Sequence, residues 1–277
     1  MESVTRTIYA MYIQAVKLRN GIFNALPNST LNEKFQGNLA PTPGTEVPAL
    51  QYIAIGSGGH EVLIDNQGNE TIREVYHKPR DGALYKHIPF IAREAGTVLP
   101  SPLSERYRLK ETKFSNGILY DFYFLKKVEN ADTSEPTMIN VYERDGTRIA
   151  TVYEANSLVL NPSNVDLNTV PVPEQTKFLS VIDRIEFSLD FNEIQEIINA
   201  YQLYYASTES PVISEIAACS GVEQVLTDGN GNPYTEAVAA QVNYFINTYY
   251  VLQSFISETR QISSFIEVGG LELLADY

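Results

Sequence analysis

Residues 108–128 read RLKETKFSNGILYDFYFLKKV, and this stretch predicts a β-hairpin at the centre of the fold. Asn116 and Gly117 both tolerate the positive φ angles of a type I′ turn, so they form the strongest hairpin signal in the chain. The turn would join a strand over 108–114 to a strand over 118–128. In the second strand an aromatic side chain recurs at every other position, which places three rings on one face of the sheet: Tyr120, Phe122 and Phe124.

Further strands are expected on both sides of this hairpin. Asp145-Gly146 has similar turn chemistry and would pair 139–142 with 148–153. Upstream, a strand over 50–56 is followed by a run of glycines, and two shorter strands flank a polar turn at 66–69. These two strands are expected over 62–65 and 71–75.

Helical signals are concentrated at the two ends of the chain. Near the N-terminus, Ser3 can cap a helix that Gly21 would end, with apolar residues near helical spacing: Ile8, Tyr12, Ala15 and Ile22. In the C-terminal part, the run Asp190-Phe-Asn-Glu193 resembles a capping box, followed by one apolar face of Ile194, Ile197, Ile198, Tyr201 and Tyr205. Thr235 would cap a longer helix with an apolar face of Val238, Val242, Phe245, Ile246 and Tyr249.

The expected fold class is α+β within one compact domain. Its parts are an N-terminal helix over 1–26, a long ordered loop arm over 27–50, a β-rich region with hairpins over 51–190, and a helical C-terminal part over 191–277. A second structureless stretch is expected over 155–176, and the tail 262–277 should be extended and broken at Gly269-Gly270. The arm and the tail have little core of their own, so both are expected to contact other chains.

Composition narrows the class of protein. With 277 residues, of which 44% are hydrophobic and 19% charged, the chain can bury a substantial core and is not expected to be disordered. A single cysteine, Cys219, excludes a disulfide scaffold and a cysteine-based zinc cluster. No apolar run approaches the roughly 20 residues of a membrane helix, and no signal peptide is expected. The formal charge of −14 argues against non-specific binding of nucleic acid.

Charge is distributed unevenly along the chain. Residues 1–130 carry 15 Lys and Arg against 13 Asp and Glu, whereas residues 131–277 carry 5 against 21. One interpretation is a solvated acidic surface. The other is self-complementarity, in which the acidic half of one subunit meets the more basic stretch 73–113 of the next.

Several local patterns resemble functional sites, and each is interpreted as structural. The run 56–59, Gly-Ser-Gly-Gly, lacks the Lys-Ser/Thr pair of a phosphate loop, so a turn is expected. The loop Asp228–Asn232 alternates oxygen ligands but lacks the closing acidic residue of a calcium loop, so a plain connection is favoured over an ion site. Cys219 is expected to be a buried, unreactive residue. No catalytic, cofactor-binding or metal-binding role is assigned, and this includes the histidines His60, His77 and His87.

The remaining candidates are residues of a subunit interface. Tyrosine supplies apolar area with a polar tip, which suits an interface as well as a half-buried surface. Reversing the charges of Arg106 and Arg108 is expected to impair assembly more than reversing those of Lys17 and Arg19. The interface residues expected from the basic stretch and from two tyrosine pairs are Arg73, Lys78, Arg80, Arg106, Arg108, Tyr204, Tyr205, Tyr249 and Tyr250.

Four segments resemble segments of a known family, and the specificity of the resemblance comes from their number and their shared order. They are KPRDGALYKHIPFIARE at 78–94, SERYRLK at 104–110, ISEIAACSGV at 213–222 and YTEAVAAQVNYFI at 234–246. Together they resemble segments of virion structural proteins of contractile-tailed bacteriophages. The resemblance extends from about residue 50 to the C-terminus, and residues 1–50 match less clearly.

The resemblance implies a virion component, assembled in the host cytoplasm, that is not an enzyme and needs no cofactor. Its partners would be copies of itself in a ring and other virion structural proteins, with no membrane and no sequence-specific nucleic acid. The neck or connector that joins head to tail is favoured, because an acidic channel lets DNA pass without binding it. A baseplate or tail-fibre-attachment protein is the alternative. A hydrolase that uses the histidines or the Asp228–Asn232 loop is a distant one.

Overall fold

The computed structural model describes residues 4–36, 46–129, 135–144, 147–154, 176–229, 231–252 and 262–274. The chain forms two compact units rather than the single domain expected. The first, called the main unit, comprises residues 1–128 and 188–262, and the second comprises residues 129–187 and 263–277. The β-rich region expected over 51–190 is therefore divided between the two units.

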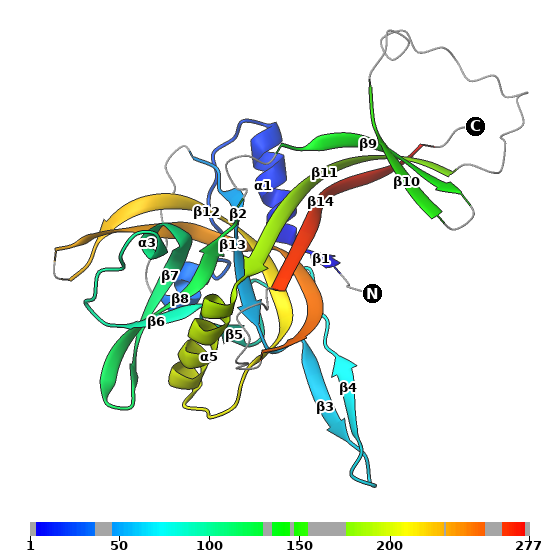
Figure 1. Cartoon of the computed structure of the whole chain (residues 1–277). Helices are drawn as coiled ribbons and strands as arrows, with labels where there is room; N and C mark the ends of the chain where they lie inside the picture. The colour runs from blue at the N-terminus through cyan, green and yellow to red at the C-terminus, as the bar shows by residue number, and fades with distance from the viewer. Residues whose placement is uncertain are drawn as a thin grey trace, which may run out of the picture. The chain divides into compact units, whose positions relative to one another are not determined.

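The main unit is built on an antiparallel sheet in which eight strands are described (Figure 1). Six of them follow the order β1-β13-β12-β2-β8-β6, while β5 pairs with β2 and β7 pairs with β8. The eight strands are β1 (Val4–Arg6), β2 (Ala49–Gly56), β5 (His87–Ile88), β6 (Ile91–Glu94), β7 (Tyr107–Ser115), β8 (Ile118–Lys127), β12 (Val212–Thr227) and β13 (Pro233–Val251).

The prediction of a helical C-terminal part, and with it the α+β class, is wrong. Two long antiparallel strands, β12 with 16 residues and β13 with 19, occupy most of this part. All residues from Glu236 to Asn243 are buried, and successive strand residues point to opposite faces, so β13 is covered on both sides. A strand buried on both faces lacks polar–apolar alternation, so its spacing from Val238 to Tyr249 could not be distinguished from that of a helix. The fold is β-rich with few helices.

The predicted capping box of the remaining C-terminal helix is confirmed. The Asp190 carboxylate accepts from the backbone N–H of Glu193 at 2.9 Å, and the Glu193 carboxylate accepts from that of Asp190 at 3.1 Å. The N-terminal helix is shorter than predicted, and its cap is Thr7, whose hydroxyl accepts from the N–H of Ala10; Ser3 lies outside the described residues. The described helices of the main unit are α1 (Ile8–Leu18), α2 (Leu31–Phe35), α3 (Leu103–Arg106) and α5 (Phe191–Tyr205).

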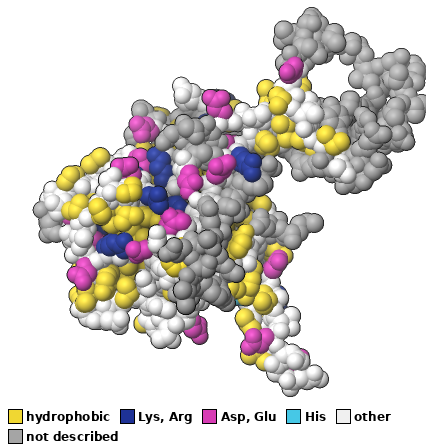
Figure 2. All heavy atoms as spheres, in the orientation of Figure 1, with side chains coloured by type: hydrophobic (Ala, Val, Ile, Leu, Met, Phe, Trp, Pro, Cys, Tyr) yellow, Lys and Arg dark blue, Asp and Glu magenta, His cyan; other side chains and the backbone are white. Residues whose placement is uncertain are grey.

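The two hairpins predicted in the main unit are confirmed. Asn116 and Gly117 have φ angles of 50° and 82°, as a type I′ turn requires, and join β7 to β8. The polar turn at 66–69, where Gly68 has a φ of 85°, joins β3 (His60–Ile64) to β4 (Glu70–Glu74). Among the described strands these two pair only with each other, and we call them the β3–β4 ribbon. Hydrophobic side chains lie exposed along the ribbon, at the lower right of Figure 2.

Part of the expected loop arm is a helix folded into the core of its own chain, and the expected contact of the arm with other chains stays a prediction. α2 carries a complete capping box between Thr30 and Glu33. Its Phe35 ring stacks on that of Phe124, with centroids 4.1 Å apart. Asn32 is fully buried; its side-chain amide donates to the carbonyl of Ala237 at 2.8 Å and accepts from the N–H of Ala240 at 2.9 Å. Residues 37–45 of the arm, like the stretch 155–175, lie outside the described residues.

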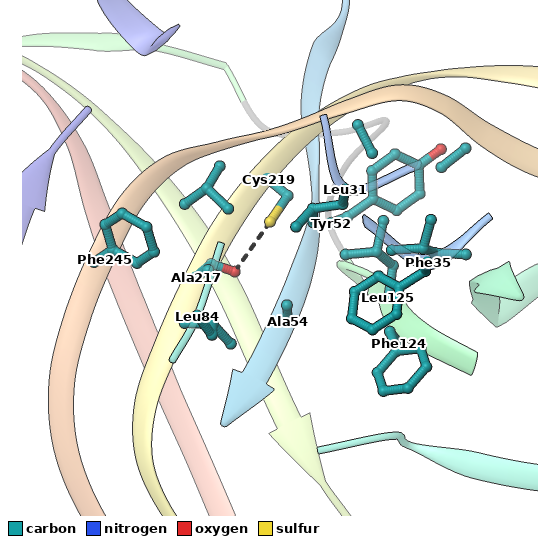
Figure 3. Packing of buried hydrophobic residues seen from close by; sticks show 14 of the residues in the cluster. Leu31, Phe35, Tyr52, Ala54, Leu84, Phe124, Leu125, Ala217, Cys219 and Phe245 are labelled. Carbon is teal, nitrogen blue, oxygen red and sulfur yellow. Dashed lines mark hydrogen bonds between the residues drawn. The ribbon is translucent and has the colours of Figure 1, made fainter. Parts of the chain in front are cut away.

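The main core lies between this arm and the sheet (Figure 3). It brings together side chains from α2, β2, β8, β12 and β13, which are far apart in the sequence. The labelled members in Figure 3 are Leu31, Phe35, Tyr52, Ala54, Leu84, Phe124, Leu125, Ala217, Cys219 and Phe245.

The second unit is a four-stranded antiparallel sheet in the order β10-β9-β11-β14. The pairing of β9 with β10 confirms the hairpin predicted around Asp145-Gly146, although these two residues lie outside the described part. The C-terminal tail is extended, as predicted, but it continues through Gly269-Gly270 without a break. The strands are β9 (Thr137–Arg144), β10 (Thr147–Val152), β11 (Thr176–Leu189) and β14 (Ile262–Leu274).

Candidate functional site

The carboxylate of Glu215 on β12 is fully buried and is bonded on all sides. It accepts hydrogen bonds from the backbone N–H groups of Gly58 at 2.8 Å, Lys86 at 3.0 Å and Tyr85 at 3.1 Å. The imidazole Nε2 of His77 lies 2.6 Å from its second oxygen. Glu215 thereby ties three separate segments to the centre of the sheet.

The glycine run 56–59 connects β2 to β3, as predicted, and its close packing against β12 and residues 85–86 explains its composition. A Cβ on Gly58 would lie 2.4 Å from the Cβ of Tyr85, and one on Gly59 would lie 2.2 Å from the carbonyl oxygen of Ser214. Real Cβ atoms do not approach that closely, so both positions require glycine. The loop binds an anion, as a phosphate loop does, but the anion is a carboxylate of the same chain.

His77 lies between two carboxylates, those of Glu215 and Asp81, whereas the imidazole of a hydrolase triad lies between one carboxylate and a nucleophile. Its Nδ1 is 3.3 Å from the Asp81 carboxylate. Both faces of the ring are closed, because Tyr85 and Phe245 stack on it with centroids 4.0 and 3.8 Å away. Since both ring nitrogens are engaged and the side chain is fully buried, a substrate has no path to either nitrogen.

The other two histidines have contacts of their own. His87 is buried, and burial lowers its pKa well below the ordinary value; its Nε2 accepts from the N–H of Leu84 at 3.1 Å. His60 lies edge-on to the ring of Tyr249, with centroids 5.2 Å apart. The first contact is a hydrogen bond within the chain, and the second is a packing contact.

A second buried carboxylate, that of Glu193 at the start of α5, is bonded to two cationic side chains and a hydroxyl. Arg106 and Tyr107 donate to one of its oxygens at 3.1 and 2.8 Å, and the Lys126 ammonium is 2.8 Å away. Burial alone would raise the pKa of Glu193, but the hydrogen bond and charge of Lys126, with Tyr107 and the N–H of Asp190, outweigh it. The pKa of this carboxyl is therefore held below its ordinary value.

Glu193 should make stability depend on pH in a defined direction. Because its folded pKa is lowered, its stabilisation is present above its unfolded value, near 4.5, and is lost as the pH falls through the folded value. We expect Glu193→Gln to lower the free energy of unfolding at pH 7 by about 1–3 kcal/mol. Urea unfolding measured from pH 7 to pH 3 should show that the difference in unfolding free energy between Glu193→Gln and the unmodified chain becomes smaller in acid. A difference that becomes larger in acid would contradict this. The control is Glu209→Gln, at an exposed carboxylate.

A third buried carboxylate, that of Glu236 on β13, is bonded to a strained backbone position within β7. It accepts from the backbone N–H groups of Leu109, Lys110 and Ala237 and from the side chain of Gln36. Leu109 adopts a left-handed φ of 62°, which is rare for a leucine, and its side chain is fully buried. Burial raises the pKa of Glu236, and these hydrogen bonds only partly offset that rise.

Many carboxylates of the acidic half are thus bonded to the first half of the same chain. Arg108 pairs with Glu223 at 2.7 Å, and Arg93 forms two hydrogen bonds to Glu196, at 2.8 and 2.9 Å. On the face drawn in Figure 2, positive and negative side chains lie interspersed over the main unit. The complementarity that the sequence suggested between subunits is, at these residues, present within one subunit.

Four of the expected interface residues are engaged inside the main unit. Arg106 bonds Glu193, and the buried Arg108 bonds Glu223 and two backbone carbonyls. The hydroxyl of Tyr204 donates to Glu111 at 2.7 Å, and that of Tyr205 donates to the carbonyl of His87 at 2.6 Å.

The other expected interface residues are more exposed. Arg73 lies on the β3–β4 ribbon, paired with Glu61, and Lys78 and Arg80 are exposed on the segment that follows. Tyr249 and Tyr250 lie near the end of β13, on a strand rather than on the helix that was predicted. For these five residues the interface stays a prediction.

The Asp228–Asn232 loop has the geometry of a self-contained turn. The Asp228 carboxylate accepts from the backbone N–H of Asn232 at 2.8 Å and from its side-chain amide at 3.2 Å. Asn230 lies outside the described residues. Over the described part of the chain, no group of three or more His, Cys, Asp or Glu side chains is arranged to hold a metal ion.

Cys219 should be inert in the folded chain. Its side chain is fully buried, and burial raises the pKa of the thiol. The thiolate is the form that reacts with disulfide reagents, so we expect no labelling of the native protein and one equivalent after denaturation. A colorimetric thiol assay with and without guanidinium measures this directly. Rapid labelling under native conditions would show that the β12 core opens readily.

An open depression of about 660 Å³ lies beside the C-terminal half of α5. Its charged lining residues are Arg93 and Glu196, which neutralise each other in a bidentate pair. The rest of the lining is amide, hydroxyl and small apolar groups, including Asn116, Asn199 and Ser207. This arrangement offers hydrogen bonds to a weakly bound polar group and no nucleophile–base pair.

Sequence reasoning named Glu193 only as part of a capping box, and it did not single out Glu215 or Glu236. The signal that could have found these two is an acidic residue within an apolar run, as Glu215 is in ISEIAA and Glu236 is in YTEAVAA. A buried acid in a strand must find donors. Most of the donors come from segments more than 100 residues away, and no local pattern identifies them.

Comparisons with known proteins give the family of the chain and no activity. No described helix is long and apolar enough to cross a membrane. No curated protein and no solved structure matches the chain. The family model that matches covers residues 1–276, almost the whole chain, and the protein therefore belongs to the family described as "Family of unknown function (DUF7208)".

Proposed function

We propose that this protein is a non-catalytic structural subunit of a tailed-bacteriophage particle and joins copies of itself in a ring at the neck between head and tail. The observation that carries the proposal is where the four phage-like segments lie. Glu215, in segment 213–222, bonds to Tyr85 and Lys86 in segment 78–94. Glu236, in segment 234–246, bonds to Leu109 and Lys110 in segment 104–110. The segments thus meet in pairs through buried carboxylates, so what they share with phage proteins would be a scaffold.

The chemistry of the buried groups supports a structural role. Glu193, Glu215 and Glu236 are each bonded to three or more donors that fix backbone or helix positions. Groups that act on a substrate keep a free position for it. The polar clusters described here instead stabilise one arrangement of strands, as a subunit that bears load in a particle requires.

Charge favours the neck over the baseplate. The internal ion pairs leave the net charge of −14 unchanged, so the excess lies on the other carboxylates. A ring through which DNA passes benefits from a wall that repels phosphate.

The test is a phage in which the gene for this chain is inactivated. We expect its lysates, viewed by electron microscopy, to contain filled heads and complete tails that remain separate. A plasmid copy of the gene should restore joined particles, and so should a copy with Glu209→Ala at an exposed position. Heads that lack tails altogether would favour the baseplate alternative, and normal particles would contradict the proposal.

A further inference from the structure

The β3–β4 ribbon presents an uncovered apolar face. Its register pairs Val62 with Ile72 and Ile64 with Glu70, so the three aliphatic side chains lie on one face. They are 51%, 50% and 68% exposed for Val62, Ile72 and Ile64. The opposite face carries Leu63 and Thr71 and the ion pair of Glu61 with Arg73. A two-stranded ribbon is marginally stable alone in water, so an apolar face of this kind is usually packed.

Helix α1 presents a second uncovered apolar surface. Its inner face, Ala10, Ile13 and Val16, is buried. Four further apolar residues recur at intervals of three and four and form an exposed outer stripe: Ile8, Met11, Ala15 and Leu18. Leu18 is 80% exposed, and Ile22, just after the helix, is 72% exposed. A surface helix normally has one apolar face, so the second face indicates a further contact.

The two surfaces carry opposite charge. Residues 60–74 contain four acidic residues and one basic, a net charge of −3. Residues 4–26 contain three basic residues, Arg6, Lys17 and Arg19, and no acidic residue, a net charge of +3. A ribbon therefore repels another ribbon, and an α1 surface repels another α1 surface, whereas a ribbon attracts α1.

We propose that the apolar face of the β3–β4 ribbon of one copy packs on the outer stripe of α1 of a second copy. The two elements lie far apart in Figure 1, α1 at the top of the main unit and the ribbon at its lower end, so they cannot pair within one chain. A contact between two different surfaces repeats from copy to copy and closes into a ring when the rotation allows it. The inference rests on the proposed function, in which copies of the chain assemble, and it names the contact through which they do so.

The first experiment uses two full-length single-site variants, Ile64→Cys and Met11→Cys. The native Cys219 is buried and should not interfere. Each variant, alone and mixed with the other, is oxidised after its fold is checked by circular dichroism. The expected result is a disulfide dimer in the mixture, with neither variant dimerising alone. Dimers of Ile64→Cys alone or Met11→Cys alone would show like surfaces meeting and would overturn the proposal.

A second experiment measures the strength of the contact. Ile72→Asp should raise the dissociation constant of self-association at least tenfold, a change of about 1.4 kcal/mol, because it places a charge in the apolar contact. Thr71→Asp, the neighbouring residue on the opposite face, should leave it unchanged and is the matched control. Equal effects of the two variants would overturn the ribbon contact.

Light scattering on the unmodified chain tests self-assembly separately from the contact between the ribbon and α1. A chain that assembles but forms no cross-link between positions 64 and 11 would overturn this contact and leave the proposed function standing. A chain that remains monomeric at high concentration would overturn both.

Discussion

Glu215→Ala is expected to lower the free energy of unfolding by at least about 4 kcal/mol, because each buried donor left unsatisfied costs about 1–3 kcal/mol. The substitution removes the acceptor of three backbone N–H groups and the partner of His77. A single water in the buried space left by the side chain accepts two hydrogen bonds, fewer than the three backbone N–H groups that face it. The loss should therefore exceed that of any single exposed ion pair, which is worth about 0–1 kcal/mol.

Chemical denaturation of the purified chain, followed by circular dichroism, measures this loss. Glu209→Ala, at an exposed glutamate, should change stability by less than about 0.5 kcal/mol. A loss below about 1 kcal/mol for Glu215→Ala would mean that the buried hydrogen bonds are not the main support of this region.

Gly59→Ala is expected to have the second largest effect. The new Cβ would lie 2.2 Å from the carbonyl oxygen of Ser214, which is backbone of the central strand β12 and cannot move aside. Relief requires a shift of the whole connection, and overpacking of this kind costs about 1–3 kcal/mol or more. Loss of the hydrogen bond from the Gly59 N–H to the Ser214 hydroxyl, 3.0 Å long, would add to the cost.

Gly229→Ala is the matched control for this substitution. A Cβ at Gly229 meets nothing within 4 Å, so only the change in unfolded-chain entropy acts there. The thermal midpoint should fall by several degrees for Gly59→Ala and stay within a degree or two for Gly229→Ala. Equal midpoints would show that the close approach at Gly59 is absent in solution.

Elements fixed by neighbouring residues could be predicted from the sequence. The Asn116-Gly117 hairpin needs only two residues that accept positive φ, and the start of α5 needs only Asp190 and Glu193 in reciprocal bonds. The long strand β13 could not be predicted, because its character depends on burial from both sides by elements distant in the sequence. The same limit applies to α2, whose five residues are held by capping and by Phe124 rather than by a long periodic pattern.

The charge asymmetry shows how a correct observation can lead to an incomplete interpretation. Opposite charges do attract each other, but Arg106 and Arg108 meet Glu193 and Glu223 of their own chain. Reversing Arg108 would place like charges together in a buried site, so its first effect would be on folding. Lys17 and Arg19, which sequence reasoning ranked below this pair, belong to the surface where assembly is now proposed.

The central claim is that copies of this chain form a ring through the ribbon and α1, and a map of the assembled phage particle by electron cryomicroscopy tests it most directly. The account predicts copies repeated around the channel axis. Each ribbon face of Val62, Ile64 and Ile72 should lie on the Ile8–Leu18 stripe of the next copy. A map in which the chain is absent from the particle, or in which ribbon and α1 both face solvent, would contradict it.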